Sequence, residues 1–121
     1  MSKIRISDTA PMVRIYPDET VEVCEEFQVE YNGMQWTVPK GYVCDGSSIP
    51  RFFWRVCGAP TTGPNLLPGI IHDHLYGTGL LPRDIADKCF HDALLKLEKP
   101  KLIAWAMWKA VRLCGKSHYS D

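Results

Sequence analysis

The sequence lacks the features that mark disulfide-stapled, metal-finger, exported and membrane-spanning proteins. Its five cysteines are odd in number, widely spread and never arranged as Cys-x-x-Cys, so we expect reduced, mostly buried thiols without a zinc or redox pair. The N-terminal stretch has no apolar signal-peptide core, and no apolar run reaches the roughly eighteen residues that a membrane helix needs. These absences predict no transmembrane segment and synthesis in a cytoplasm.

An excess of charge of one sign is also missing. The chain has 14 basic and 14 acidic residues, so its formal net charge is zero and no general attraction to nucleic acid is expected. Hydrophobic residues make up 45% and charged residues 23%, proportions that argue against extended disorder. At 121 residues the chain is long enough for one hydrophobic core, so we predict a single domain over 1–121.

Strand patterns dominate residues 1–49. "VRIYP" and "VEVCEEFQVEY" are rich in β-branched and aromatic residues, and "FQVEY" and "MQWTV" flank Asn32-Gly33. Asn-Gly between two such runs is the strongest short signal for a β-hairpin, because both positions tolerate a positive φ. We therefore predict a small antiparallel sheet with a hairpin at Asn32-Gly33.

Residues 50–121 have a helical pattern. "PRFFWRVC" favours a short helix, and longer helices are predicted over about 66–77, 83–97 and 100–114. Three to four helices after a small sheet make an α+β fold. The last helix, "PKLIAWAMWKAVRLCG", is apolar on more than one face, which favours burial on most sides. The alternative is a membrane-surface or partner-docking helix, since exposed Trp and Met are typical of interfaces.

Two predicted helices carry a candidate reaction centre. His72 and Tyr76 lie one turn apart on the first, while the adjacent Asp73 points about 100° away. The connector is centred near Leu80, and His72 and Asp87 lie at similar separations on either side of it. An antiparallel hairpin would bring Asp87 to His72, where a carboxylate fixes the tautomer of an imidazole and raises its basicity.

The neighbouring carboxylate predicts a second role. Asp73 is placed to hold a hard cation through oxygen, and Asp45 in "CDGSSIP" is either a second acidic ligand or an Asp turn bonded to its own backbone. A transition-metal hydrolase using His72, Asp73, Asp87 and Asp45 is also chemically possible, though the chain has few histidines. A polar contact that only joins the two helices is the structural alternative for the whole set.

Three sequence blocks resemble a small phage and prophage family known as a domain of unknown function. They are Asp-Gly-x-Ser-Ile-Pro, His-Asp-x-Leu-Tyr and Arg-x-x-Ala-Asp-x-x-Phe, and they occur in this order between about residues 39 and 114. The resemblance implies a viral or prophage origin, with synthesis in the host cytoplasm and incorporation into the virion as an option. It also leaves open a non-enzymatic virion, tail or lysis-associated protein whose His-Asp-Tyr network only pins the helices.

His-Asp-x-x-Tyr followed by Ala-Asp-x-x-Phe is similar to the catalytic helix pair of phospholipase A2, especially the disulfide-free parvoviral form. The similarity implies that His72 activates water, Asp87 orients His72, Tyr76 supports the network and Asp73 binds calcium. It further implies a phospholipid or another ester as substrate, with the Trp-rich last helix and "RFFW" as a lipid-contacting rim. The connector is shorter than in the parvoviral form, and "CGAPTTGPNLL" departs from a Gly-rich calcium loop.

Overall fold

A computed structural model describes residues 4–7, 12–18, 20–44 and 66–114. The predicted α+β fold is confirmed, because strands occupy the N-terminal part and helices follow. The predicted short helix in "PRFFWRVC" and the candidate ligand Asp45 lie outside the described residues. The elements are β1 (Ile4–Ile6), β2 (Val13–Ile15), β3 (Val21–Val23), β4 (Phe27–Tyr31), β5 (Met34–Val38), β6 (Val43–Cys44), α2 (Leu66–Thr78), α3 (Arg83–Lys96) and α4 (Lys101–Cys114).

The strands form two antiparallel sheets, each of three strands, where the sequence predicted one small sheet. Their orders are β1-β4-β5 and β2-β3-β6. The predicted hairpin joins β4 to β5, with Tyr31 opposite Met34. Asn32 and Gly33 have φ of 50° and 89°, so the turn has the two positive φ values that suit the twist of the strands.

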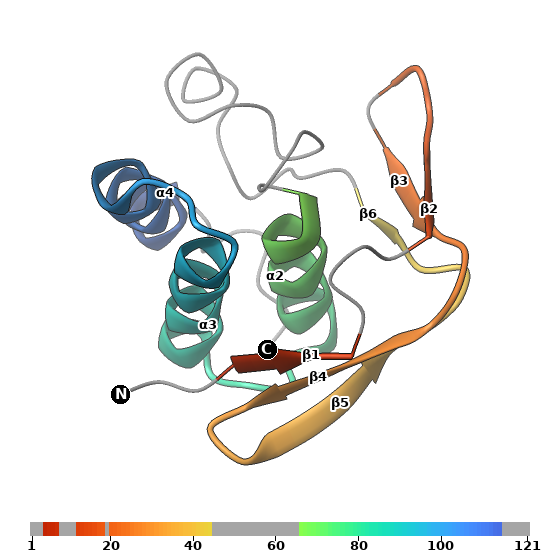
Figure 1. Ribbon diagram of the computed structural model, residues 1–121, viewed down its shortest axis with the longest axis horizontal. Helices are drawn as coiled ribbons and strands as arrows, with labels where there is room; N and C mark the ends of the chain where they lie inside the picture. The colour runs from red at the N-terminus through yellow and green to blue at the C-terminus, as the bar shows by residue number, and fades with distance from the viewer. Residues whose placement is uncertain (1–3, 8–11, 19, 45–65, 115–121) are drawn as a thin grey trace.

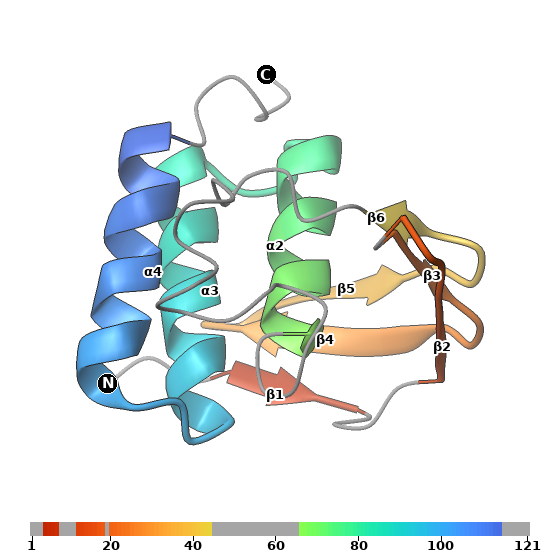
Figure 2. The same cartoon turned by 90° about the horizontal axis from the view of Figure 1, so that it is seen from above.

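Three helices lie side by side, with α2 and α3 against the sheets (Figure 1). α2 and α3 are neighbours because only residues 79–82 connect them, and Gly79 ends α2 with a left-handed φ of 64°. α3 contacts β1 and α2 contacts β6, so the helices cover one face of the first sheet and one side of the second. α4 packs on the outer side of α3, away from both sheets (Figure 2).

The core joins both sheets to α2 and α3. Buried residues on alternate positions of β4 and β5, such as Val29 and Val38, meet buried residues of α2 such as Ile71 and Leu75. A second cluster, centred on Phe90 and Met107, holds α3 against α4. α2 packs against the sheets on one side and against α3 on another, which places the polar side chains of these two faces out of solvent.

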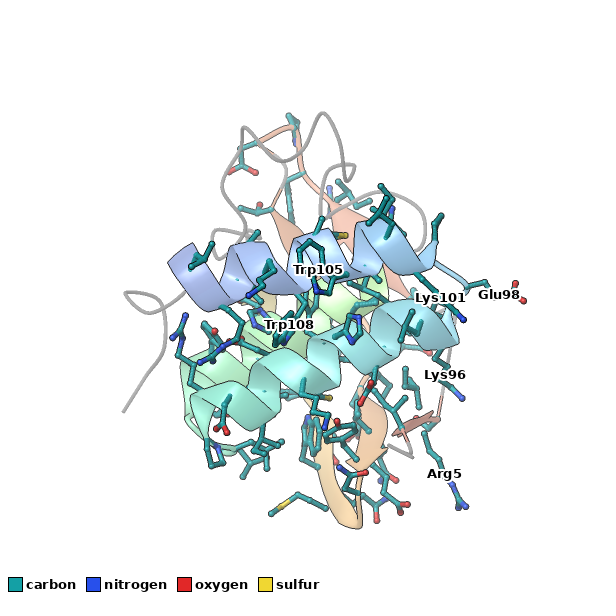
Figure 3. All side chains as sticks on the ribbon, turned by 90° about the vertical axis from the view of Figure 1, so that its left-hand side faces the viewer. Arg5, Lys96, Glu98, Lys101, Trp105 and Trp108 are labelled. Atoms are coloured by element: carbon teal, nitrogen blue, oxygen red, sulfur yellow. The ribbon has the colours of Figure 1, made fainter. Side chains whose placement is uncertain are left out.

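The expectation that the last helix is buried on most sides is wrong. Only one face of α4 is buried, through Ala104, Met107, Ala110 and Val111. Leu102, Trp105 and Leu113 are 75%, 50% and 77% exposed, and Figure 3 shows Trp105 and Trp108 on the side turned away from the sheets. Among the described residues, no helix is long and apolar enough to cross a membrane.

Candidate active site

The carboxylate of Asp87 lies at the centre of a buried polar network between α2 and α3. His72 Nε2 lies 2.7 Å from Asp87 Oδ1, and the hydroxyl of Tyr76 donates to the same oxygen. His72 and Tyr76 are four residues apart on one helix, so both reach across to the same point on α3. The structure thus brings together the three residues that the sequence placed at the candidate reaction centre.

Two arginines extend this network to α4. Arg112 Nη1 donates to Asp87 Oδ2 at 2.8 Å, on the side of the carboxylate opposite His72 and Tyr76. Arg83 Nε donates to the Tyr76 hydroxyl at 3.2 Å, and its Nη2 donates to the carbonyls of Val111 and Arg112 at 2.8 and 2.7 Å. A cation that binds the last carbonyls of a helix satisfies groups that the helix itself leaves unpaired.

The surroundings of Asp87 keep it ionised although it is 0% exposed. Burial opposes the charged carboxylate, but the hydrogen bonds from His72, Tyr76 and Arg112 outweigh it and lower the pKa of Asp87. Burial and the nearby Asp87 carboxylate raise the pKa of Tyr76 well above its usual range, so this hydroxyl stays protonated and donates. The carboxylate is therefore a fixed negative charge whose two oxygens accept from three side chains.

The imidazole of His72 is enclosed by aromatic rings. Its centroid lies 4.1 Å from that of Tyr76 and 4.8 Å from that of Phe90, and the side chain is 1% exposed. The Asp87 bond turns Nε2 of the ring toward the carboxylate. Because Asp87 is ionised, Nε2 is the nitrogen that carries the proton, and Nδ1 is the basic atom of the neutral ring.

The second candidate carboxylate lies on a different side of α2. Asp73 is half-buried, and its Oδ2 accepts a hydrogen bond of 2.7 Å from the Tyr42 hydroxyl. His74 packs edge-on against the Tyr42 ring at 5.1 Å, and burial lowers its pKa. Tyr42 directly precedes β6, so this cluster ties α2 to the second sheet, while His72 ties it to α3.

The predicted metal site lies only partly within the described part of the chain. Residues 4–7, 12–18, 20–44 and 66–114 contain no group of three or more His, Cys, Asp or Glu side chains placed to hold one ion. Asp73 is the described member of the predicted pair, and its partner Asp45 lies outside these ranges. The described residues therefore supply one carboxylate ligand and do not by themselves make a calcium site.

Sequence reasoning missed Tyr42, Arg83 and Arg112. Arg83 had a usable signal, because it lies four residues before Asp87 on the same predicted helix and so shares its face. Arg112 comes from another helix 25 residues away, and no spacing in the sequence pairs it with Asp87. Tyr42 lies among turn formers, where nothing distinguishes a tyrosine that binds a carboxylate from one that only packs.

The fold and the network define an α+β protein with a buried His-Asp-Tyr cluster between its helices and two partly exposed arginines bound to that cluster. Residues 21–111 match the family described as "Protein of unknown function (DUF1353)", and the chain belongs to this family. It is 32% identical over 100 residues to the uncharacterized protein y4jT of Sinorhizobium fredii, an alignment that covers 82% of this chain and 30% of the relative. The chain thus spans under a third of that protein, and no solved structure matches it significantly.

Proposed function

We propose that this chain is a hydrolase in which Asp87 holds His72 as a general base. The observation that carries the proposal is the 2.7 Å contact of His72 Nε2 with an ionised, buried carboxylate. An anchored Nε2–H directs base chemistry to Nδ1, and an adjacent negative charge stabilises the imidazolium that forms when a proton is taken. Tyr76 and Arg112 serve as positioning residues, because each fixes one oxygen of Asp87.

The reaction we propose is ester hydrolysis, as the similarity of the helix pair to phospholipase A2 suggests. His72 Nδ1 would take a proton from water while the water oxygen adds to the ester carbonyl carbon. Collapse of the tetrahedral intermediate breaks the carbon–oxygen bond of the ester, and His72 returns the proton to the leaving alkoxide. A phospholipid is the substrate class that this similarity favours.

Calcium is the proposed cofactor, with Asp73 as its ligand. A hard cation prefers carboxylate oxygens, and Asp73 directs its carboxylate away from the His72 ring to the Tyr42 side of α2. The cation would polarise a carbonyl and stabilise the developing oxyanion. Another divalent ion is the alternative, and no step above depends on either.

An assay of the purified chain tests this proposal. Vesicles of phosphatidylcholine or phosphatidylglycerol and the soluble ester p-nitrophenyl butyrate are offered with calcium and with a chelator. We expect hydrolysis by the wild type, loss in His72→Gln and in Asp87→Asn, and loss of calcium dependence in Asp73→Asn. Asp92→Asn is the matched control, since Asp92 lies on the same helix and accepts a hydrogen bond from Tyr31, outside the network. Absence of ester hydrolysis under every condition would contradict the proposal.

The burial of the network favours a second candidate function. His72, Tyr76 and Asp87 are no more than 1% exposed. Arg83 of α3 binds two carbonyls of α4, and Arg112 of α4 binds Asp87 of α3, an arrangement suited to locking three helices together. In this alternative the chain is a non-enzymatic virion, tail or lysis-associated protein of phage or prophage origin. Ester turnover separates the two. The non-enzymatic protein hydrolyses no ester and its Asp87→Asn variant loses only stability, whereas in the hydrolase a folded Asp87→Asn variant also loses the turnover of the wild type.

A further inference from the structure

A groove on the outer surface of α3 and α4 is separate from the His72 side of the network. Its volume is about 430 Å³, within the range of roughly 300–1,000 Å³ typical of small-ligand pockets. Its described lining comes entirely from α3 and α4. Asp87 lies between this groove and His72, because Arg112, which lines the groove, binds the carboxylate oxygen opposite the histidine.

Flat apolar surfaces line the groove. Trp105, which is half-exposed, and Trp108 come from α4, and Ile85 and His91 come from α3. The His91 and Trp108 rings lie 6.1 Å apart at 51°, and Lys109 lies over both indoles, 5.9 and 5.5 Å from their centroids. Exposed indole rings of this kind bind aromatic groups by offset or edge-on stacking.

The charged groups of the groove favour an anion. Lys88 and Arg112 contribute two positive charges to the lining and Asp84 contributes one negative charge, while the buried Asp87 carboxylate behind the lining pairs with Arg112. Arg112 gives one guanidinium nitrogen to Asp87 and is 32% exposed, so its remaining donors can bind a carboxylate in the groove. An aromatic body with one carboxylate thus matches both the indole surfaces and the charge.

We propose that this groove binds a small aromatic carboxylate and that Arg112 is shared between the ligand and Asp87. A second copy of the chain is a poorer occupant, because α4 carries Lys101, Lys109 and Arg112 without an acidic residue and would repel itself. A flat bilayer surface fills a concave groove less well than a compact ring does. The site does not depend on ester hydrolysis, so it can be present whether or not His72 is catalytic.

Titration of the protein with 2-naphthoate, followed by the NMR signals of the indole N–H groups of Trp105 and Trp108, tests the proposal. We expect saturable shifts of the Trp105 and Trp108 signals and about tenfold weaker binding of the neutral 2-naphthamide, which corresponds to the loss of one hydrogen bond to a charged group. Lys88→Glu should weaken naphthoate binding about tenfold as well. Trp105→Ala should weaken both probes, because it removes a stacking surface that does not depend on charge.

Two matched controls make the result decisive. Lys96→Glu makes the same charge change on α3 outside the groove, and Leu102→Ala truncates an exposed apolar residue of α4 outside it. Both should leave naphthoate binding unchanged. Three results would overturn the proposal: no saturable shift at millimolar naphthoate, equal binding of the amide, or equal weakening by Lys88→Glu and Lys96→Glu. Binding of anionic vesicles through the same residues, without naphthoate binding, would assign the face to a membrane instead.

Discussion

Replacing Asp87 with asparagine should destabilise the protein strongly, because one amide cannot replace a carboxylate that accepts from both sides. Asp87 Oδ1 accepts from His72 and Tyr76, and Oδ2 accepts from Arg112. In either orientation, the amide NH₂ of asparagine faces at least one donor. The less costly orientation keeps its oxygen toward α2 and leaves Arg112, which is 32% exposed, to turn toward solvent.

The expected loss is about 2–4 kcal/mol. Losing a hydrogen bond to a charged group costs roughly 1.5–3 kcal/mol, and breaking a fully buried ion pair costs roughly 3–5 kcal/mol. Partial exposure of Arg112 moves the expected loss from the second range toward the first. For a chain of this length, the melting temperature should fall by roughly 10 °C. Urea unfolding at pH 7, followed by circular dichroism, measures the difference, and Asp92→Asn is the control for loss of a carboxylate on α3.

The effect should depend on pH in one direction. The folded-state pKa of Asp87 is lowered, so its stabilising contribution is present above the ordinary aspartate pKa of 3.8 and is lost as the pH falls through the folded value. The difference between wild type and Asp87→Asn should therefore be constant from neutral pH to about pH 5 and should shrink below pH 4. A difference under about 0.5 kcal/mol at pH 7, or one that does not change on acidification, would refute this reasoning.

Three further outcomes are expected. Arg83→Met should lower the free energy of unfolding by about 2 kcal/mol and speed amide hydrogen exchange at the end of α4, since two carbonyls there lose their donor. Unchanged exchange rates would contradict this prediction. Burial raises the pKa of the Cys89 thiol to about 12, so Cys89 of the native protein should not be alkylated at pH 8, while the half-buried Cys24 should react faster. Peptide mass spectrometry measures both, and equal labelling of the two cysteines would contradict the prediction. Gly33→Ala should lower the free energy of unfolding in urea by about 1 kcal/mol through backbone strain alone, because φ is 89° and nothing lies within 4 Å of the added carbon. Asn32→Ala, at φ 50°, is the comparison variant. An unchanged free energy of unfolding in Gly33→Ala would contradict this account of strain.

Much of the fold follows from local signals. Asn32-Gly33 predicts its hairpin because the turn chemistry is complete within four residues, and the three long helices follow from apolar spacing with Gly and Pro at their ends. The division into two sheets was not predictable in this way. β1, β2 and β3 are only three residues long, and their pairing is set by long-range packing that short patterns do not encode.

The candidate site was predictable where it depends on one helical hairpin. His72 and Asp87 lie at similar separations from the connector, so an antiparallel arrangement brings them together, as the 2.7 Å contact demonstrates. The arginines that complete the network, and the exposed face of α4, depend on how a third helix packs on the first two. Apolar residues on more than one face of α4 suggested burial on most sides, yet only the face that packs against α3 is buried.

The tautomer of His72 is the most direct test of the central claim that Asp87 prepares this ring as a base. Long-range nitrogen–proton correlation spectra of the ¹⁵N-histidine-labelled protein separate the ring nitrogens, and loss of one set of signals in His72→Gln assigns them. For the neutral form of the ring we predict the proton on Nε2 and an unprotonated Nδ1. A proton on Nδ1 with an unprotonated Nε2 would contradict the account, because that tautomer cannot take a proton from water at Nδ1.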